Sequence, residues 1–194
     1  MPSPRRPWRR LTLAVMAATA AASVAMVVGL WGTAQFSLRS GHPRDVGRLS
    51  ELQLGPGLAN QWVRAEGGLE EDGAIRYQRP LSSDWFRLAR AAGSQVWVEV
   101  RVPEELEGPH FLPPPSFVGR LVPLGSAGLS HGDLGESAAS VHGAQRPAPG
   151  AWLLIDGDTP AASRWALGLI AILLGFAAFN LWGLWRLVRP LQRI

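Results

Sequence analysis

Two long uncharged segments dominate the hydrophobic pattern of this chain, one near each end. They read "LTLAVMAATAAASVAMVVGLW" (residues 11–31) and "WALGLIAILLGFAAFNLWGLW" (residues 165–185). At about 1.5 Å of rise per residue, a helix of this length spans roughly 30 Å, which is the thickness of the hydrocarbon core of a bilayer. The pattern therefore predicts two transmembrane helices, at 11–31 and 165–185.

Arginine and tryptophan flank both segments. Four arginines lie in residues 1–10 and three in residues 186–194, and neither tail contains an acidic residue. Basic tails stay on the cytoplasmic side, so the sequence predicts cytoplasmic termini and an extracytoplasmic domain over residues 32–164. The indoles near the ends of the apolar segments suit the headgroup region; they are Trp8, Trp31, Trp165, Trp182 and Trp185.

The first segment has an alternative interpretation as a cleaved signal peptide. Gly32 and Ala34 supply small residues at the spacing of a cleavage site. A secretory apolar core is usually about 7–15 residues long, however, and this segment is longer and ends in Trp31. An uncleaved membrane anchor is therefore preferred.

Between the helices, short segments with alternating apolar residues predict β-strands. The clearest is "SQVWVEVRV", in which the valines point to one face and Trp97, Glu99 and Arg101 to the other. We expect the valine face to form the core and the Glu99 face to meet solvent. Four more segments have strand character, namely "NQWVRAEGGL", "AIRYQRP", "FVGRLVPL" and "AWLLID".

The remaining segments complete the predicted domain. Residues 44–54 show apolar positions three apart, which favours a short amphipathic helix, and Asp72-Gly73 favours a hairpin turn between two strands. Residues 82–93 fit either a short helix or a strand, and the Gly/Ser/Ala-rich residues 125–150 predict a long flexible loop. The expected fold class is an α+β membrane protein whose two transmembrane helices bracket a small, mainly antiparallel β barrel or sandwich.

Composition narrows the class of function. The net charge of +4 would suit a nucleic-acid-binding protein, but seven of the 19 basic residues lie in the tails, which leaves 12 against all 15 acidic residues in the middle. A mildly acidic domain argues against nucleic acid as a partner. Without cysteine the chain has no disulfide and no thiolate metal site. Arginine without lysine, together with abundant Ala, Gly and Pro, is typical of a GC-rich bacterial genome, so we expect a bacterial inner membrane protein.

The stretch "LLIDGDT" raises the question of phosphoryl-transfer chemistry. An apolar strand followed by Asp156-Gly-Asp158 resembles the first motif of the haloacid-dehalogenase phosphatases, in which the two carboxylates act as nucleophile and as general acid. That family requires a following α/β domain and a lysine, whereas here a membrane helix begins at Trp165 and the chain has no lysine. A turn is preferred, with Asp158 or Thr159 capping the second helix.

Other polar residues do not form a recognisable catalytic pattern. The histidines share no ligand spacing, and Glu70, Glu71 and Asp72 sit on an expected hairpin tip where they stay ionised. We therefore predict no catalytic, cofactor-binding or metal-binding residue, no cofactor and no enzymatic activity. The four histidines are His42, His110, His131 and His142.

Small residues recur at spacings of three and four along both apolar segments. Such stripes let helices approach closely, either within this chain or between two copies. Asn180, the one strongly polar residue in the segments, suits a hydrogen bond between helices or a place near the interface. The candidate packing residues are Gly168, Ala171, Gly175, Ala178 and Asn180, with a similar stripe formed by Ala14, Ala18, Ala22, Ala25 and Gly29.

These observations favour a non-enzymatic binding, scaffold or assembly module of the bacterial envelope. Its expected partners are the lipid bilayer and another membrane or periplasmic protein, or a second copy of itself. The layout is similar to that of certain membrane-bound assembly factors, but their motifs are not found, so no function is carried over. A further alternative is an envelope hydrolase, which would need a polar pocket that the pattern does not reveal.

A sensor input module is the main alternative. After the second helix, "RLVRPLQRI" resembles the opening of a HAMP linker, with Pro190 and Ile194 at the proline and aliphatic positions. A proline after a membrane helix is also a common helix stop. The sensor alternative requires an output domain after Ile194, so the reading frame beyond that residue distinguishes the two classes.

Overall fold

The computed structural model describes residues 7–79, 83–103, 112–127, 147–148 and 150–188. The chain divides into two compact units, which are treated separately. One contains the N-terminal residues to Trp31 and the C-terminal residues from Trp165, and the other contains Gly32–Arg164. The HAMP-like residues 189–194, the first six residues and most of the expected loop 125–150 lie outside the described ranges.

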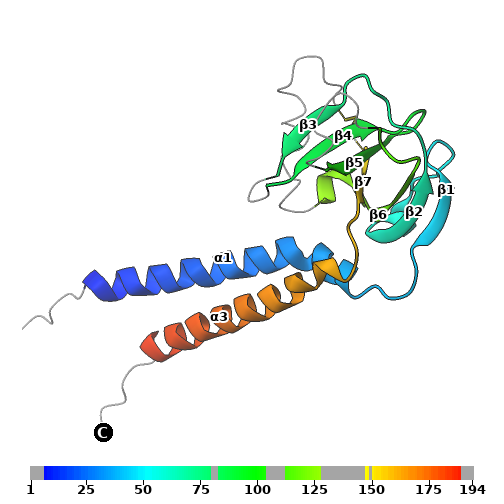
Figure 1. The fold of residues 1–194 in the computed structure, drawn as a ribbon. Helices are drawn as coiled ribbons and strands as arrows, with labels where there is room; N and C mark the ends of the chain where they lie inside the picture. The colour runs from blue at the N-terminus through cyan, green and yellow to red at the C-terminus, as the bar shows by residue number, and fades with distance from the viewer. Residues whose placement is uncertain (1–6, 80–82, 104–111, 128–146, 149, 189–194) are drawn as a thin grey trace, which may run out of the picture. The chain divides into compact units, whose positions relative to one another are not determined.

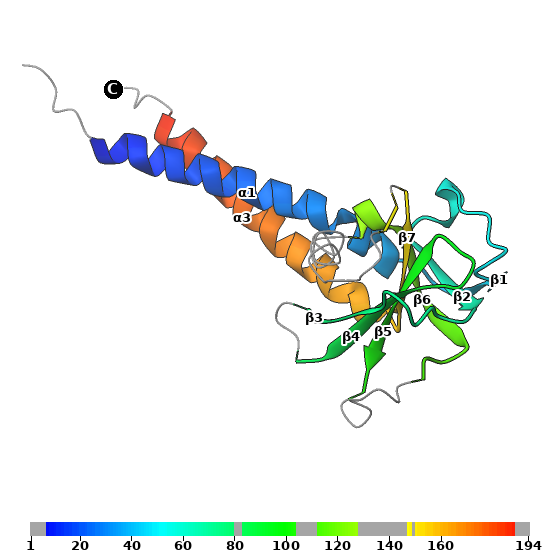
Figure 2. The same ribbon diagram turned by 90° about the horizontal axis from the view of Figure 1, so that it is seen from above.

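The first unit is a pair of long helices, α1 (Pro7–Ser37) and α3 (Trp165–Val188), of which α1 continues past Trp31 into the second unit. They run side by side in opposite directions (Figures 1 and 2), and the Thr19 hydroxyl lies 3.3 Å from the Asn180 side-chain oxygen. By length and composition, each helix is long and apolar enough to cross a membrane. Two long apolar helices at the ends of the chain are thus confirmed.

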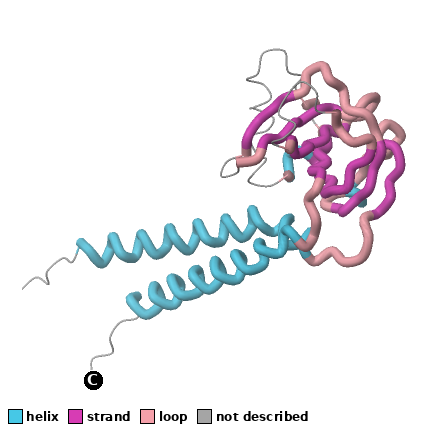
Figure 3. The backbone as a smooth tube through the Cα atoms, in the orientation of Figure 1, coloured by secondary structure: helices cyan, strands magenta, loops and turns pink. Residues whose placement is uncertain are grey.

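The second unit is built on one seven-stranded sheet, drawn in magenta in Figure 3. Its strand order is β1-β2-β6-β7-β5-β4-β3. The strands are β1 (Arg44–Arg48), β2 (Gln61–Glu66), β3 (Ile75–Gln78), β4 (Trp85–Arg90), β5 (Val96–Val102), β6 (Ser116–Pro123) and β7 (Trp152–Asp156).

Four of the six strand pairings are antiparallel, as the prediction of a mainly antiparallel domain requires, but the strands form one mixed sheet that does not close, so the predicted barrel or sandwich is wrong. Strands β1 and β2 are parallel, as are β5 and β7, whereas the other neighbours are antiparallel. Strand β7 lies in the centre of the sheet and brings the end of the domain back between β5 and β6. This insertion of a C-terminal strand depends on long-range pairing, which local alternation does not reveal.

Both faces of the sheet carry apolar side chains. One cluster joins residues of β2, β5, β6 and β7, and the other includes Leu88, Trp97, Val122, Leu153 and Ile155 on the opposite face. Strands buried on both faces read as continuous apolar runs, as "AWLLID" does.

Gly119 shows how closely the central strands approach one another. A Cβ atom at this position in β6 would overlap the backbone carbonyl of Ile155 in β7. Only glycine leaves room for that approach, and the antiparallel pairing of Gly119 with Asp156 lies at the same place.

Two local predictions are wrong. Residues 44–54 begin as strand β1 and continue in turns, although Val46, Leu49 and Leu52 pack on one core as a helix face would. Gly47 has a φ of +67°, which breaks a helix. The turn at Asp72-Gly73 forms, with Gly73 at a φ of +78°, but β2 and β3 do not pair with each other.

Candidate functional site

The turn Asp156-Gly157-Asp158 serves a structural role. Gly157 adopts a φ of +78° at the end of β7, and the Asp156 carboxylate accepts a hydrogen bond from the Val118 backbone N–H at 2.9 Å. Burial raises the pKa of Asp156, and this backbone hydrogen bond opposes the rise. This hydrogen bond ties the end of β7 to β6.

Asp158 and Thr159 accept hydrogen bonds within the segment that leads into α3. The Asp158 carboxylate accepts a hydrogen bond from the Ser163 hydroxyl at 3.0 Å, and the Thr159 hydroxyl accepts one from the Ala162 backbone N–H at 3.3 Å. Thr159 therefore caps a short 3₁₀ turn (Ala162–Arg164) that leads into the helix. This arrangement fits the preferred interpretation of a turn and a cap.

The described residues contain no group of three His, Asp or Glu side chains placed to hold a metal ion. Among the histidines, His42 is exposed, and His110, His131 and His142 lie outside the described ranges. Glu70 in the predicted acidic tip is half-buried rather than solvated.

A buried charge cluster lies at β3, β4 and β5. Glu99, expected to face solvent, is 1% exposed, and it accepts hydrogen bonds from the Tyr77 hydroxyl and from the Arg79 guanidinium, whose Nε lies 2.8 Å away. The Arg79 guanidinium also stacks 4.1 Å from the centroid of the Phe86 ring. Burial and the neighbouring Glu99 charge raise the pKa of Tyr77, so this phenol stays protonated.

The prediction for Glu99 is wrong because both sheet faces are covered. Its strand face also carries Trp97, which packs in the second apolar cluster with Tyr77 against its edge. Alternation locates Glu99 opposite the valines, but it does not tell whether another layer covers that face. All four valines are buried, as expected, and Val96, Val98 and Val100 belong to the first cluster.

The predicted packing residues of α3 separate into two faces. Gly168, Ala171, Gly175 and Ala178 are all exposed, and a Cβ at Gly168 or Gly175 would meet open space. Asn180 is buried against α1, where its amide donates to the Phe176 carbonyl at 2.8 Å and its oxygen faces Thr19. The packing of the small-residue stripe in another copy stays a prediction.

Apart from Asn180, the residues that lie inward between the two helices differ from the predicted set, and they recur at spacings of three and four. That spacing is typical of helix pairs with a left-handed crossing. It is present in the sequence, but it cannot be recognised there because nearly every residue of both helices is apolar. Gly183 lies against α1 as well, since a Cβ there would overlap the Met16 methyl group. The inward positions are Leu13, Met16, Ala20, Ser23, Val27 and Leu30 in α1, and Ala166, Ile170, Leu173, Ala177, Asn180 and Leu184 in α3.

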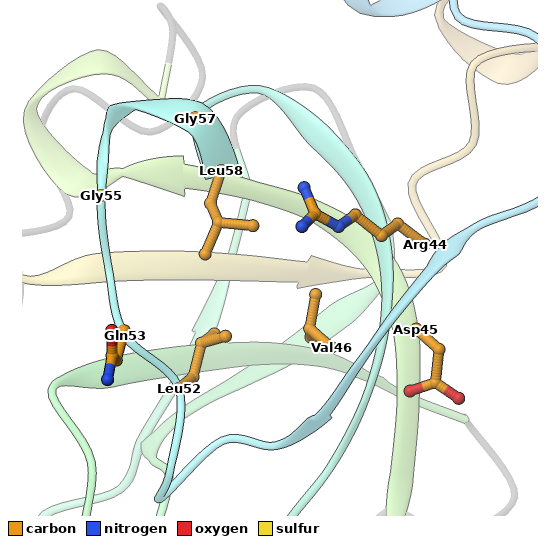
Figure 4. A pocket seen from close by; sticks show the side chains of 8 residues that line it. All are labelled: Arg44, Asp45, Val46, Leu52, Gln53, Gly55, Gly57 and Leu58. Carbon is orange, nitrogen blue, oxygen red and sulfur yellow. The ribbon is translucent and has the colours of Figure 1, made fainter.

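A groove of about 390 Å³ lies beside the edge strand β1 (Figure 4). Val46, Leu52 and Leu58 point toward its middle, while the Arg44 guanidinium reaches over one rim and Asp45 points away. An aliphatic floor with a cation at its edge suits an apolar side chain of a partner. Sequence reasoning missed it because Val46 comes from a strand, Leu52 from the following loop and Leu58 from a short 3₁₀ helix.

Comparison of the chain with protein-family models, with curated proteins and with solved structures found no match.

Proposed function

We propose that this protein is a two-pass envelope membrane protein whose sheet domain faces outward and binds a protein partner without catalysing a reaction. One observation carries the proposal, namely the inverted polarity of the helix pair. Its polar side chains Ser23 and Asn180 are buried between the helices, whereas its large apolar side chains lie on the outside.

The energetics of that inverted pair favour lipid as its solvent. Ile172, Phe179 and Val28 are among the many large apolar residues exposed on the two helices, with exposed fractions of 69%, 63% and 70%. A water-soluble helix pair buries such residues, because exposing them costs about 25 cal/mol per Å² of apolar surface. In hydrocarbon, exposing the same apolar surface carries no such free-energy cost. Polar groups that lie between the helices can find hydrogen-bond partners there, whereas polar groups facing the lipid would have none.

The charge distribution supports cytoplasmic termini and an outward sheet domain. Seven arginines in the terminal tails, with no acidic residue there, follow the positive-inside bias. The Arg186 guanidinium lies 5.5 Å from the Trp182 ring centroid, a pairing suited to the membrane interface. We place the protein in a bacterial inner membrane on this basis.

The groove beside β1 supports a binding role for the outward domain. Its floor of Val46, Leu52 and Leu58 offers apolar contact, while the carboxylates that resemble a phosphatase motif are used in hydrogen bonds within the fold. A protein segment that inserts an aliphatic side chain between Arg44 and Leu52 is the proposed ligand of this groove.

The membrane topology can be measured directly. The protein should stay in the membrane fraction after alkaline carbonate extraction, a reporter fused after residue 34 of a truncated chain should report outside, and a reporter at Ile194 of the full chain should report inside. An outside report at Ile194 would refute the two-pass model.

The binding role is tested by photo-crosslinking in intact cells. A photoreactive residue in place of Leu52, on the groove floor, should give a discrete crosslinked product, whereas the same residue in place of the exposed Arg76 on β3 should not. Leu52→Glu should remove the product formed from a photoreactive residue in place of Gln53 on the same groove. Equal crosslinking from Arg76 and Leu52 would speak against a specific groove partner.

A further inference from the structure

Arg120 is a buried cation whose hydrogen-bonding capacity is incompletely used. It lies in β6, is 4% exposed, and donates from Nε to the Asn60 side-chain oxygen at 2.7 Å and from Nη1 to the Thr33 hydroxyl at 3.4 Å. A guanidinium has five N–H groups, and beyond these two bonds the Arg120 guanidinium has no acceptor among the residues that the structure describes. Within the described ranges Arg120 forms no ion pair, although the Asp158 charge acts on it at longer range.

A second unsatisfied donor lies beside it. The Trp62 Nε1–H is buried and has no hydrogen-bond partner in the part of the chain that the structure describes. Trp62 in β2 is the direct register partner of Arg120 in β6. Directly opposed residues on antiparallel strands project from the same face with Cβ atoms about 4.5–5.5 Å apart. The two donors therefore share one face of the sheet.

The surroundings hold the Arg120 side chain in place. Its guanidinium lies 5.0 Å from the Phe36 ring centroid, and its acceptor Asn60 is itself fixed by a hydrogen bond to the Gly32 carbonyl at 2.9 Å. Asn60 adopts a φ of +60°, an unusual backbone conformation for a residue with a side chain. This preorganised arrangement costs free energy, because a buried charge without a full set of partners is expensive. An anion that accepts the remaining hydrogen bonds would recover it.

The residues of α1 that contact Arg120 indicate which kind of anion could reach it. Its partners Gly32, Thr33 and Phe36 follow directly after the apolar segment that ends at Trp31. At about 1.5 Å of rise per residue they lie roughly 2–8 Å beyond that end. The headgroup layer of a bilayer occupies about the same interval, and its phosphates are the abundant anions there.

We propose that Arg120 and the Trp62 indole form a binding site for a phosphate group, supplied by a lipid headgroup of the outer leaflet. The assignment to lipid rests on the proposed membrane function, whereas the donor pair itself does not. The planar guanidinium suits a phosphate because it presents parallel N–H groups to two oxygens, and the indole N–H suits a third oxygen.

The test uses the full chain in micelles of an uncharged sugar detergent. One arm adds phosphatidylglycerol or, as its control, diacylglycerol with the same tails and no phosphate; the other adds inorganic phosphate or chloride at equal ionic strength. The readouts are the thermal unfolding midpoint and the lipid retained in native mass spectrometry. We expect phosphatidylglycerol to raise the midpoint and to be retained, and diacylglycerol to do neither.

Three variants locate the site. Arg120→Gln should weaken phosphatidylglycerol binding about tenfold or more, and Trp62→Phe, which keeps an aromatic ring but removes the N–H, about threefold to tenfold. Arg64→Gln is the matched control, because Arg64 is exposed on the same face of β2 and carries the same charge. It should bind as the unaltered protein does. Trp62→Phe keeps the test decisive if Arg120→Gln fails to fold.

The outcomes separate the sources of the phosphate. Binding of inorganic phosphate alone, lost in Trp62→Phe, supports the donor pair but assigns it to a soluble phosphate. No response to either phosphate, or an equal loss in Arg64→Gln and Trp62→Phe, overturns the proposal and leaves only water for these donors. Carbonate extraction reports membrane insertion independently, so failure of the anchor and failure of the phosphate site are distinguishable.

Discussion

In the helix pair, polar Ser23 and Asn180 lie inward while apolar Ile172 lies 69% exposed; in the sheet domain, Val98 and Leu154 lie inward with no exposed surface. The two regions of one chain thus distribute polarity in opposite ways. Under the proposed function, each arrangement minimises the free energy in a different solvent, hydrocarbon for the helix pair and water for the sheet domain. The comparison teaches that the pattern of buried and exposed side chains, and not hydrophobicity alone, indicates whether a helix or strand is suited to water or to lipid.

Polar groups in the two regions also differ in how they are satisfied. Asn180 bonds within its own helix and faces one neutral hydroxyl, whereas Glu99 in the sheet is buried as a charge and needs Arg79 as well as Tyr77. Burying a neutral amide between two helices costs little free energy, because a single hydrogen bond satisfies it. A buried carboxylate depends on its cation, so the sheet domain should be the more sensitive of the two regions.

The largest expected effect comes from charging the sheet core. Val98→Asp places an unpaired carboxylate at a fully buried position and should unfold the domain, since the cost of several kcal/mol is comparable with a total stability of about 5–15 kcal/mol. Arg101→Gln, at an exposed position near the end of the same strand, is the control and should cost at most about 1 kcal/mol. Protease resistance of the full chain in detergent measures both. Equal resistance would contradict the position of β5 in the core.

A smaller but still large effect should follow from breaking the buried ion pair. Glu99→Ala leaves Arg79 without its carboxylate and should cost about 3–5 kcal/mol. Asp84→Ala breaks the Arg101–Asp84 pair, whose side chains are 67% and 30% exposed, and should cost about 0–1 kcal/mol. Urea unfolding of the two variants provides the comparison. If both cost the same, Glu99 is not part of a buried cluster.

The helix pair should respond to added volume on one face only. Gly183→Ile would meet the Met16 methyl group, the movable end of a flexible side chain, and should weaken the pair by about 1 kcal/mol, whereas Gly175→Ile enters open space and should cost less. Unfolding by titration with a denaturing detergent, followed by circular dichroism, measures the difference. The reverse order would mean that the small-residue stripe, and not the inward set, packs α3 against its neighbour.

The smallest effect concerns pH. Burial raises the pKa of Asp156 in the folded state above its ordinary value of 3.8, so the native chain binds this proton more tightly than the unfolded chain does. The contribution of Asp156 to stability should therefore decrease as pH rises from about that value toward the folded pKa. Asp156→Asn keeps an acceptor for the Val118 N–H but should lose this slope. An unchanged pH profile of the unfolding midpoint would refute the assignment.

Much of the secondary structure can be read from the sequence because it depends on local period and length. The apolar segments that contain α1 and α3 are readable, as are the alternation of β5 and the turns at Gly73 and Gly157. The same local rules predict the long apolar helix that begins at Trp165, shortly after Asp158. They also favour strands for most of the segments between the helices.

The tertiary structure alone decides which strands pair and which faces are covered. Asp72-Gly73 signals a turn whether or not β2 and β3 become neighbours, and residues 44–54 suit one apolar face as a helix or as a strand with turns. Glu99 alternates with valines in either case, and only the layer over the second face turns it from a solvated charge into a buried one. Long-range contacts supply that information, because pairing and burial join residues that are far apart in the chain.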